Sequence, residues 1–433
     1  MEHLENLYGR IFTANQISYE ARKIARTKDS FECDGKDYYC GRCFTKADKD
    51  HLLPNGHYYC RRCLIFGRVQ SHDKLYYFPA QPFPKGNYLK WKGALTPYQE
   101  SISKQLVENY YLEKRSLVYA VTGAGKTEMI YRIIKEVVNS GKWVALVSPR
   151  IDVCIEVHKR LSRDFSCQIV LMHAESESYH RAPLVIATTH QLLKFYKAFH
   201  LIIIDEVDSF PFVDNPLLNR AVMSALTEEG RLIYLTATST KFLEREVING
   251  KLTKITLPRR FHSNPLIVPD FQLIFNLQRY LDRDKLPHKL FSAIQKQTTF
   301  LYPLLIFFPI IEKGQKFYET LVKIFPSHKI GYVSSQTIKR KELIENFRRG
   351  ELSILVTTTI LERGVTIPSV DVFVILAHHH LFTSSSLIQI AGRVGRSVDR
   401  PTGKVIFFHE GVSSAMYRAR KEIRGLNKEA YGL

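Results

Sequence analysis

The feature that most restricts the fold is a repeated alternation of short apolar segments with stretches of helical spacing. From residue 117 onward, LVYAV, WVALVS, LVIATT, LIIID and LIYLTAT alternate with helix-like stretches. A second round begins after Pro265 with LLIFFP, KIGYVSS, SILVTTT, VDVFVILA and KVIFFH. Buried strands that alternate with helices indicate a parallel sheet covered on both faces. We therefore predict two tandem α/β lobes with parallel sheets.

The length of 433 residues suits two or three domains. We predict an N-terminal segment at 1–30, a cysteine-rich module at 31–85, a first lobe at 86–262 and a second lobe at 263–433. Three prolines within 78–88 predict a linker into the first lobe. The start lacks a secretory signal pattern, and every apolar run is shorter than the roughly 20 residues of a membrane span. The sequence thus predicts a cytoplasmic protein.

The charge balance points to a polyanionic partner. The chain has 62 Lys and Arg against 42 Asp and Glu, a net charge of +20. A surplus of this size favours binding to a polyanion. A merely soluble basic protein is the alternative, and charge alone does not distinguish DNA, RNA and anionic lipid.

Five of the seven cysteines lie between Cys33 and Cys63. Cys40 and Cys43 form one Cys-X-X-Cys pair, Cys60 and Cys63 form another, and 16 residues separate the pairs. This spacing is typical of a four-thiolate zinc site, whose metal replaces the core that so short a segment lacks. Scattered free thiols are the alternative. We predict that these four cysteines bind Zn²⁺ and that Cys33 is a bystander.

Aromatic and basic residues interleave around these cysteines, as in YYCGRCF and YYCRRC. This combination suits single-stranded nucleic acid, because cations meet phosphates and bases stack on rings. The same tyrosines can instead pack the small module, and both interpretations stay open.

The stretch AVTGAGKT at 120–127 is typical of a phosphate-binding loop between a strand and a helix. Gly123 and Gly125 let backbone amides close around phosphate oxygens, and the following helix directs its positive end at them. Lys126 is expected to reach the β- and γ-phosphates, and the Thr127 hydroxyl is expected to bind Mg²⁺. The predicted nucleotide-binding residues of this loop are Thr122, Gly123, Ala124, Gly125, Lys126 and Thr127.

A second catalytic element follows the apolar run of LIIIDEVD at 201–208. The predicted strand delivers Asp205 and Glu206 to its carboxyl end. Asp205 is expected to hold Mg²⁺, and Glu206 is expected to orient or deprotonate the attacking water. A solvated acidic turn is the alternative.

These motifs resemble those of superfamily 2 helicases and translocases over about residues 90–433, and LTPYQ, SPR, TTHQ, TAT, TTTILERGVTIP and QIAGRVGR are similar to further motifs of that superfamily. The resemblance implies two RecA-like lobes, ATP as substrate and recognition of adenine by Gln99. It implies that Arg393 and Arg396 are arginine fingers that act across the cleft between the lobes. We expect both arginines on one helix. The resemblance also lets Gln389 position the water. Such guanidinium groups stabilise the charge that builds on the γ-phosphate.

The four-cysteine module ahead of the first lobe, together with LTPYQ and DEVD, resembles the ComFA family of late competence proteins. That resemblance implies a cytosolic ATPase that acts on single-stranded DNA and helps draw transforming DNA through a membrane channel. It implies a ComF-type phosphoribosyltransferase-like partner (ComFC), the DNA-processing protein DprA, a peripheral link to the channel at the inner face of the membrane, and homo-oligomers.

Three other functions remain open from the sequence. A replication-restart or repair helicase like PriA also carries zinc, although there the zinc module is inserted within the helicase core. An RNA helicase shares the core motifs. A non-catalytic binding protein with a degenerate ATP site is opposed by the intact Lys126, Asp205 and Arg393.

Overall fold

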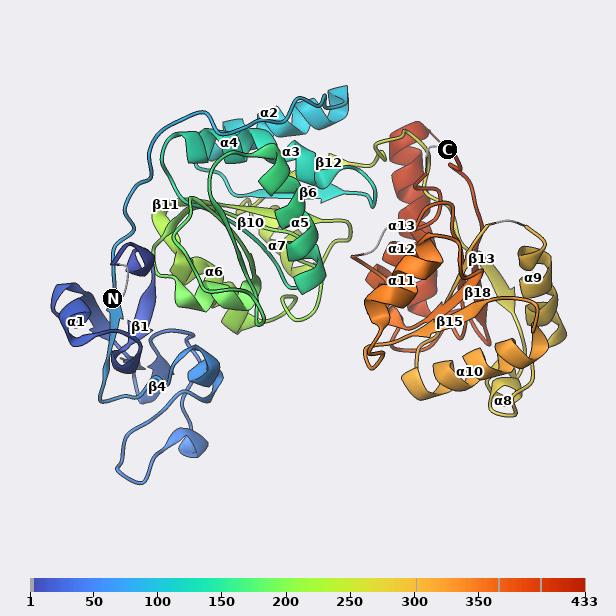
Figure 1. Ribbon diagram of the computed structural model, residues 1–433, viewed down its shortest axis with the longest axis horizontal. Helices are drawn as coiled ribbons and strands as arrows, with labels where there is room; N and C mark the ends of the chain where they lie inside the picture. Colours follow the sequence, from blue (N-terminus) through green and yellow to red (C-terminus); the bar gives the residue numbers. More distant parts are fainter. Residues whose placement is uncertain (1–3, 301, 365–366, 398, 433) are drawn as a thin grey trace. The chain divides into compact units, whose positions relative to one another are not determined.

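The computed structural model divides into two compact units, which are described separately (Figure 1). The first unit contains the chain up to Tyr119 together with Lys126–Thr256, and the second contains Ala120–Gly125 together with the chain from Leu257. The residues described are 4–300, 302–364, 367–397 and 399–432. Val365 and Thr366 of the TTTILERGVTIP motif therefore lie outside the described residues.

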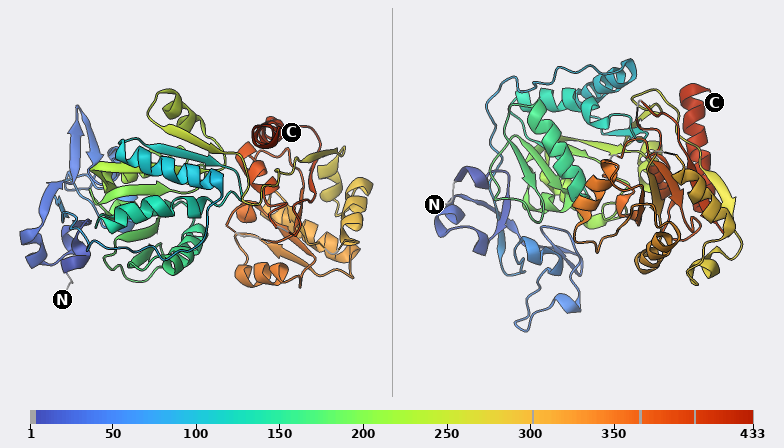
Figure 2. Two further views of the ribbon diagram at one scale, coloured as in Figure 1. Left: turned by 90° about the horizontal axis from the view of Figure 1, so that it is seen from above. Right: turned by 45° about the vertical axis from the view of Figure 1, so that its right-hand side comes forward.

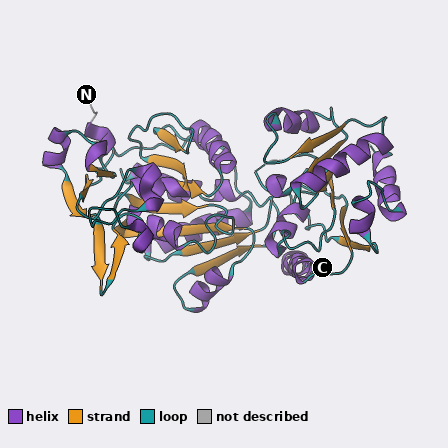
Figure 3. Cartoon of the chain, turned by 90° about the horizontal axis from the view of Figure 1, so that it is seen from below, coloured by secondary structure: helices purple, strands orange, loops and turns teal. Residues whose placement is uncertain are grey.

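The N-terminal part of the first unit is a small antiparallel sheet with the strand order β1-β5-β2. Since β5 lies between β1 and β2, both ends of the cysteine-rich module are anchored in this sheet. A hairpin of two strands, β3 and β4, projects from the module (Figures 2 and 3). The strands and helices of this part are β1 (Ile11–Thr13), α1 (Tyr19–Ile24), β2 (Arg26–Asp29), β3 (Phe31–Asp34), β4 (Asp37–Cys40) and β5 (Lys74–Tyr77), with 3-10 helices at Leu4–Leu7, Ala14–Gln16, Lys49–His51 and Arg61–Phe66.

The proline-containing segment 78–88 is anchored on the first lobe and is not the free linker that its composition predicts. The indole nitrogen of Trp143 donates a hydrogen bond to the Gln81 carbonyl at 2.8 Å. The Phe83 ring lies 4.9 Å from the Trp143 ring, and the Arg181 guanidinium lies 4.1 Å from the Phe83 ring. Arg181 also donates to the Gln81 carbonyl at 2.6 Å. Aromatic burial and satisfied main-chain carbonyls hold the segment in place.

The first lobe is built on a seven-stranded sheet with the order β12-β6-β11-β10-β7-β9-β8. All neighbouring strands from β6 to β8 pair in parallel. Helices α2 and α4 lie on one side of the sheet and α6 on the other (Figure 1). The elements are α2 (Pro97–Tyr111), β6 (Ser116–Ala120), α3 (Lys126–Met129), α4 (Tyr131–Asn139), β7 (Val144–Ser148), α5 (Ile151–Asp164), β8 (Ile169–Met172), β9 (Leu184–Thr188), the 3-10 helix η5 (Thr189–Lys194), β10 (Phe199–Ile204), α6 (Pro216–Ala225), β11 (Leu226–Thr236), α7 (Lys241–Ile248) and β12 (Thr253–Leu257).

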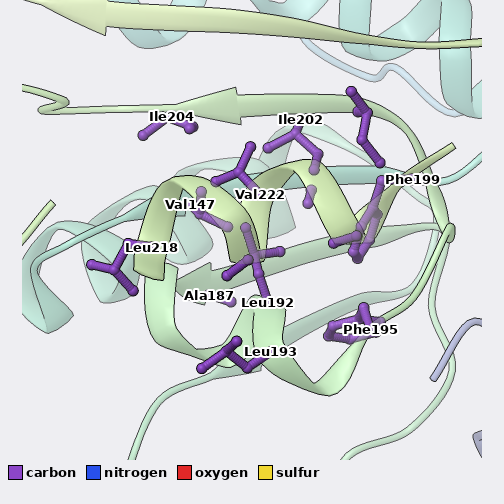
Figure 4. Packing of buried hydrophobic residues seen from close by; sticks show 14 of the residues in the cluster. Val147, Ala187, Leu192, Leu193, Phe195, Phe199, Ile202, Ile204, Leu218 and Val222 are labelled. Carbon is purple, nitrogen blue, oxygen red and sulfur yellow. The ribbon is translucent and has the colours of Figure 1, made fainter. Parts of the chain in front are cut away.

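One buried cluster joins this sheet to the N-terminal part. Val147 and Ile202 of the sheet face Leu218 and Val222 of α6 (Figure 4). The same cluster continues into the N-terminal sheet and the cysteine-rich module through Ile11, Leu75, Cys40, Cys43, Cys60 and Cys63. The module and the first lobe therefore share one core, which explains why they form one compact unit.

The second lobe has a six-stranded sheet with the order β13-β18-β17-β14-β16-β15, and every neighbouring pair is parallel. This arrangement, the parallel sheet of the first lobe and the N-terminal cysteine cluster confirm the predicted fold class. The elements are β13 (Asp270–Leu273), α8 (Leu277–Leu281), α9 (His288–Thr298), β14 (Leu304–Phe307), α10 (Ile311–Ile324), β15 (Ile330–Val333), α11 (Arg340–Arg348), β16 (Ile354–Thr357), a 3-10 helix (Thr359–Leu361), β17 (Asp371–Val374), α12 (Ser384–Ala391), β18 (Val405–His409) and α13 (Ser414–Tyr431).

The helices of the described segments do not meet the requirements for a membrane span. None of them combines the length and the apolar character that crossing a bilayer requires.

The anchoring of segment 78–88 predicts its resistance to proteolysis. Arg181→Ala removes two hydrogen bonds to the segment, which is worth about 1–2 kcal/mol. We expect tryptic cleavage after Lys85 to become roughly 10-fold faster, because cleavage follows the population of the opened segment. Timed digestion with mass spectrometry measures the rate, and Arg283→Ala, an exposed arginine of the second unit, is the control. Wild-type cleavage as fast as that of a flexible peptide would contradict the anchoring.

Candidate functional site

The predicted phosphate-binding loop connects β6 to α3. Strand β6 ends at Ala120 and α3 begins at Lys126. Gly123 has a φ of +82° and Gly125 a φ of +73°. This left-handed region is unfavourable for residues that have a Cβ atom, so both positions suit glycine. The loop thus has the strand–turn–helix setting that exposes backbone amides to an anion.

The sheet register brings the two predicted catalytic elements to one edge of the first lobe. Strand β11 lies between β6 and β10, with Tyr119 opposite Thr236 and Ile204 opposite Tyr234. The strands are parallel, so the loop after β6, Asp205 after β10 and the turn after β11 all emerge at the carboxyl edge. In open α/β sheets this edge is where ligands bind.

The turn after β10 holds its two carboxylates in a defined geometry. The backbone N–H of Asp205 donates to the Val147 carbonyl at 2.8 Å, and the Asp205 carboxylate accepts the N–H of Glu206 at 2.8 Å. Glu206 has a φ of +54°, which is uncommon for a residue other than glycine. The Ser209 hydroxyl donates to the Glu206 carboxylate at 3.3 Å. Strained backbone of this kind concentrates at functional sites.

Asp208 connects this turn to the TAT motif and is buried, with 8% exposure. Its carboxylate accepts a hydrogen bond from the Thr238 hydroxyl. The Thr236 hydroxyl accepts the N–H of Thr238 at 3.1 Å and donates to the Thr238 carbonyl at 2.6 Å. The acidic stretch is therefore a packed element and not a solvated turn. The sequence singled out TAT as a motif, but the hydrogen bond from Thr238 to Asp208 and the contact of Ser209 were missed because hydroxyl partners leave no spacing signal.

Gln99 lies at the start of α2 and is buried, with 2% exposure. Its side-chain oxygen accepts hydrogen bonds from the Thr96 backbone N–H at 2.9 Å and from the Thr96 hydroxyl at 3.1 Å. This is a capping box that satisfies backbone groups at the start of the helix. The structure thus gives the amide oxygen of Gln99 a structural partner, and adenine recognition stays a prediction.

A cavity of about 460 Å³ lies beside the start of α2 and was not predicted from the sequence. Trp91, Leu95 and Ser103 line one part of it, and Tyr131 and Lys135 of α4 line another. The signal that could have found it is Trp91, a large aromatic residue shortly before LTPYQ.

The predicted arginine fingers lie in the second lobe, just beyond α12. Gln389 is on the last turn of this helix, with 7% exposure, and Arg393 has 2% exposure. We expected both arginines on one helix, but α12 ends at Ala391 with Gly392 as its C-cap. Arg393 and Arg396 therefore lie in the turn after the helix. The Arg396 Nε donates to the Gly392 carbonyl at 2.8 Å.

The two groups of predicted catalytic residues belong to different compact units. Lys126, Asp205 and Glu206 are in the first unit, whereas the loop residues Thr122–Gly125, Gln389 and the two arginines are in the second. Their joint action on one nucleotide is therefore part of the functional proposal.

The four predicted metal ligands come together in the cysteine-rich module. Their sulfur atoms all lie within 4.8 Å of one another, with 3.8 Å between Cys40 and Cys63 and 3.4 Å between Cys43 and Cys60. Sulfur ligands at 2.3 Å from a tetrahedral zinc are about 3.8 Å apart. Hydrogen bonds among the four thiols lower the pKa of Cys43 and Cys60 and raise the pKa of Cys40 and Cys63, so the geometry of the four sulfur atoms carries the assignment. The residues present fit zinc.

Arg42, between the two cysteines of the first pair, is buried with 3% exposure. Its guanidinium donates to the Phe66 carbonyl at 2.5 Å and to the Gly67 carbonyl at 3.3 Å. Burial lowers the pKa of Arg42, while the four cysteines beside it act in the opposite direction. A cation here would offset the net negative charge of a four-thiolate zinc site, as groups around the ligands commonly do.

The aromatic residues of the module pack mainly on one another. Tyr38 stacks on Tyr58 at 5.2 Å, and Tyr39 stacks on Phe44 at 4.7 Å. Phe44 also lies 4.5 Å from the guanidinium of Arg220 in α6. These contacts favour the packing interpretation of the tyrosines, and the last one fixes the module to the first lobe.

Family comparisons define the class of protein. Residues 92–241 match the model described as "Type III restriction enzyme, res subunit", and residues 289–398 match the model described as "Helicase conserved C-terminal domain". A structure of S. cerevisiae Dbp5 bound to RNA and ADP BeF3 superposes with a TM-score of 0.54 at 16% identity, covering 77% of this chain and 92% of that one. A structure of RecG bound to a three-way DNA junction gives a TM-score of 0.54 at 18% identity, covering 78% and 47%. Such identities show the fold alone. The chain is a superfamily 2 helicase, an ATP-dependent enzyme.

Curated relatives identify the family within this class. The chain is 54% identical over 422 residues to the competence protein ComFA of Streptococcus pneumoniae, covering 98% of both chains. It is 35% identical over 439 residues to ComFA of Bacillus subtilis, covering 99% of this chain and 90% of the relative. The chain belongs to the ComFA family, and its role is in competence.

The thiol geometry predicts about one zinc per chain in the purified protein. Cys40→Ser removes one of the four ligands and is expected to lose the metal and to lower the melting temperature, because the metal stabilises the module. Elemental analysis by mass spectrometry measures the content. Cys33→Ser is the matched control, since this thiol is exposed and outside the cluster. A wild-type protein purified without chelators that lacks zinc would refute the assignment.

Proposed function

We propose that the protein is an ATP-driven translocase that moves along single-stranded DNA and draws transforming DNA into the cell during competence. The observation that carries this proposal is the common sheet edge at which the loop after β6, Asp205 and the TAT motif emerge, in a chain of the ComFA family. The net charge of +20 supports a polyanionic track.

The first lobe would bind and activate ATP. Residues Thr122 to Gly125 would enclose the phosphates with backbone amides, and Lys126 would contact the β- and γ-phosphates. Thr127 and Asp205 would hold Mg²⁺, which neutralises charge on the phosphate oxygens. Glu206 would orient or deprotonate the attacking water, and the hydrogen bond from Ser209 supports that alignment because it restrains the carboxylate.

The second lobe would complete the site when the nucleotide draws the lobes together. Arg393 and Arg396 would stabilise the charge that develops on the γ-phosphate, and Gln389 would help position the water. Hydrolysis would then release the lobes. If each lobe holds the DNA strand, one cycle of ATP binding and hydrolysis changes the spacing of the two lobes along the DNA and moves it.

The base of ATP would lie near the start of α2. Gln99 is held there by its capping contacts with Thr96. The neighbouring cavity offers the aromatic ring of Trp91, which suits stacking on a purine.

The zinc module would have a structural role in this motor. Zn²⁺ bound by four thiolates is a closed site that stabilises the fold and leaves no position for catalysis. The module shares its core with the first lobe, which supports a rigid platform for either DNA or a partner protein. We propose a ComFC-type phosphoribosyltransferase-like protein and DprA as partners, a peripheral link to the uptake channel at the membrane, a cytoplasmic location and homo-oligomers.

Hydrolysis should depend on single-stranded DNA and on Lys126. We expect single-stranded DNA to stimulate the ATPase activity more than duplex DNA or RNA does. The three nucleic acids are compared at the same salt concentration, because salt weakens all contacts to the phosphate backbone. Lys126→Ala should abolish hydrolysis and leave DNA affinity unchanged, since it removes only the phosphate contact. Rates and fluorescence anisotropy check both expectations, with Lys323→Ala, an exposed lysine of α10, as the control. Greater stimulation by RNA would favour an RNA helicase, and unchanged turnover in Lys126→Ala would refute the site.

The arginine-finger assignment predicts a loss of turnover without a loss of nucleotide binding. Arg396→Ala should slow hydrolysis by about 10³-fold or more, which is the range for removal of such a group. The dissociation constant for a non-hydrolysable ATP analogue should change little, because the guanidinium acts mainly on charge that develops in the transition state. Single-turnover kinetics and calorimetry measure the two quantities. A nearly normal rate would place the finger elsewhere.

A further inference from the structure

A buried arginine outside the known motifs contacts the turn that carries the arginine fingers. Arg260 follows β12 by three residues, in the stretch that connects the two sheets, and only 5% of it is exposed. Its Nη1 donates to the carbonyls of Val394 and Gly395, both at 2.8 Å, and its Nη2 donates to the carbonyl of Gly392 at 3.2 Å. One side chain thus donates to three main-chain carbonyls within the four residues Gly392 to Gly395.

These acceptors are the C-cap residue of α12, Gly392, and two residues of the turn that follows it. The last carbonyls of a helix lack partners within the helix and carry partial negative charge. A buried guanidinium is suited to them because its planar fork presents several donors at fixed angles. A lysine ammonium offers a single centre and would not reproduce the three contacts.

The contacts converge on the proposed catalytic groups. The carbonyl of Gly392 accepts both the Arg260 Nη2 at 3.2 Å and the Arg396 Nε at 2.8 Å. Burial, together with the charge of Arg396, lowers the pKa of Arg260 to about 9. Arg260 and Arg396 therefore share an acceptor, and the position of one guanidinium depends on the other.

The turn is also tightly packed at Gly395. Gly395 has a φ of +70°, and a Cβ there would lie 2.5 Å from the Pro401 carbonyl oxygen and 3.1 Å from the Arg260 Nη1. Gly395 therefore packs directly against both Arg260 and the backbone at Pro401. Loss of the Arg260 guanidinium removes its hydrogen bonds to the carbonyls of Val394 and Gly395 and opens the packing at Gly395.

We propose that Arg260 is a positioning residue for the arginine fingers, which links the connector between the two sheets to the turn that carries Arg393 and Arg396. This inference rests on the proposed function. It makes the connector part of the catalytic apparatus, because displacement of the connector would withdraw the donors that set the turn.

The test compares Arg260→Met with Arg260→Lys and with the neighbouring Arg259→Met. A displaced finger should lower kcat of the DNA-stimulated ATPase by about 10²-fold, the effect of a misplacement near 1 Å. KM for ATP and affinity for single-stranded DNA should change less than about threefold, because the transition state is affected selectively. Arg260→Lys should not restore the rate, since it keeps the charge and loses the fork. Arg259→Met, whose guanidinium lies 5.0 Å from the Tyr431 ring, should retain kcat.

A double-mutant cycle separates positioning from a general loss of stability. In the Arg396→Ala background, Arg260→Met should reduce kcat little further, because the group that it positions is already absent. Multiplied losses in the double variant would overturn the proposal. So would a full recovery of kcat in Arg260→Lys, or a kcat loss in Arg260→Met that disappears at a temperature well below its melting point. If Arg260→Met does not fold, Arg260→Lys carries the same cycle.

The outcomes also separate this inference from the function on which it rests. If wild-type turnover and Arg396→Ala behave as proposed but Arg260→Met has a normal kcat, only the positioning role is wrong. If Arg396→Ala has a normal rate, the finger assignment fails and the positioning role fails with it.

Discussion

The proposed nucleotide site depends on the hydrogen-bonded register of β6, β11 and β10. These parallel strands end at one edge, so a loop, a carboxylate and a threonine turn that are far apart in sequence emerge together. A register slip by one residue would invert the facing of a buried strand and displace Asp205 from that edge. The continuous apolar runs that bury both faces of these strands make such a slip costly. The packing of the sheet thus fixes where the proposed phosphate-binding and Mg²⁺-binding residues lie.

The sequence was informative where burial is complete. The runs from LVYAV to KVIFFH predicted the central strands of both sheets, since a strand buried on both faces is apolar throughout. It failed for β8, β12 and β13 (Asp270–Leu273), which lie at the ends of the sheet orders. An edge strand can be partly exposed, as β13 is, and its mixed composition resembles a loop. The end of α12 was missed because tertiary contacts to Gly392 compete with helical spacing.

The partners of the site residues were harder to foresee than the residues themselves. Lys126 and Asp205 belong to motifs with fixed spacing, but Ser209 and Arg260 make hydrogen bonds to the site that only the folded chain creates. The same limit explains segment 78–88. Its prolines predict a linker, whereas its anchoring to Trp143 depends on residues more than 50 positions away.

The shared core of the cysteine-rich module and the first lobe determines whether a fragment without the N-terminal part can stay soluble. Ile11 and Leu75 pack in the same cluster as Trp143 and Phe199. A fragment that starts at the first lobe would leave that apolar surface in water. Such surfaces tend to self-associate, so we expect this fragment to aggregate, which light scattering would detect. The cysteine-rich module would then cover apolar surface of the first lobe and keep this chain soluble.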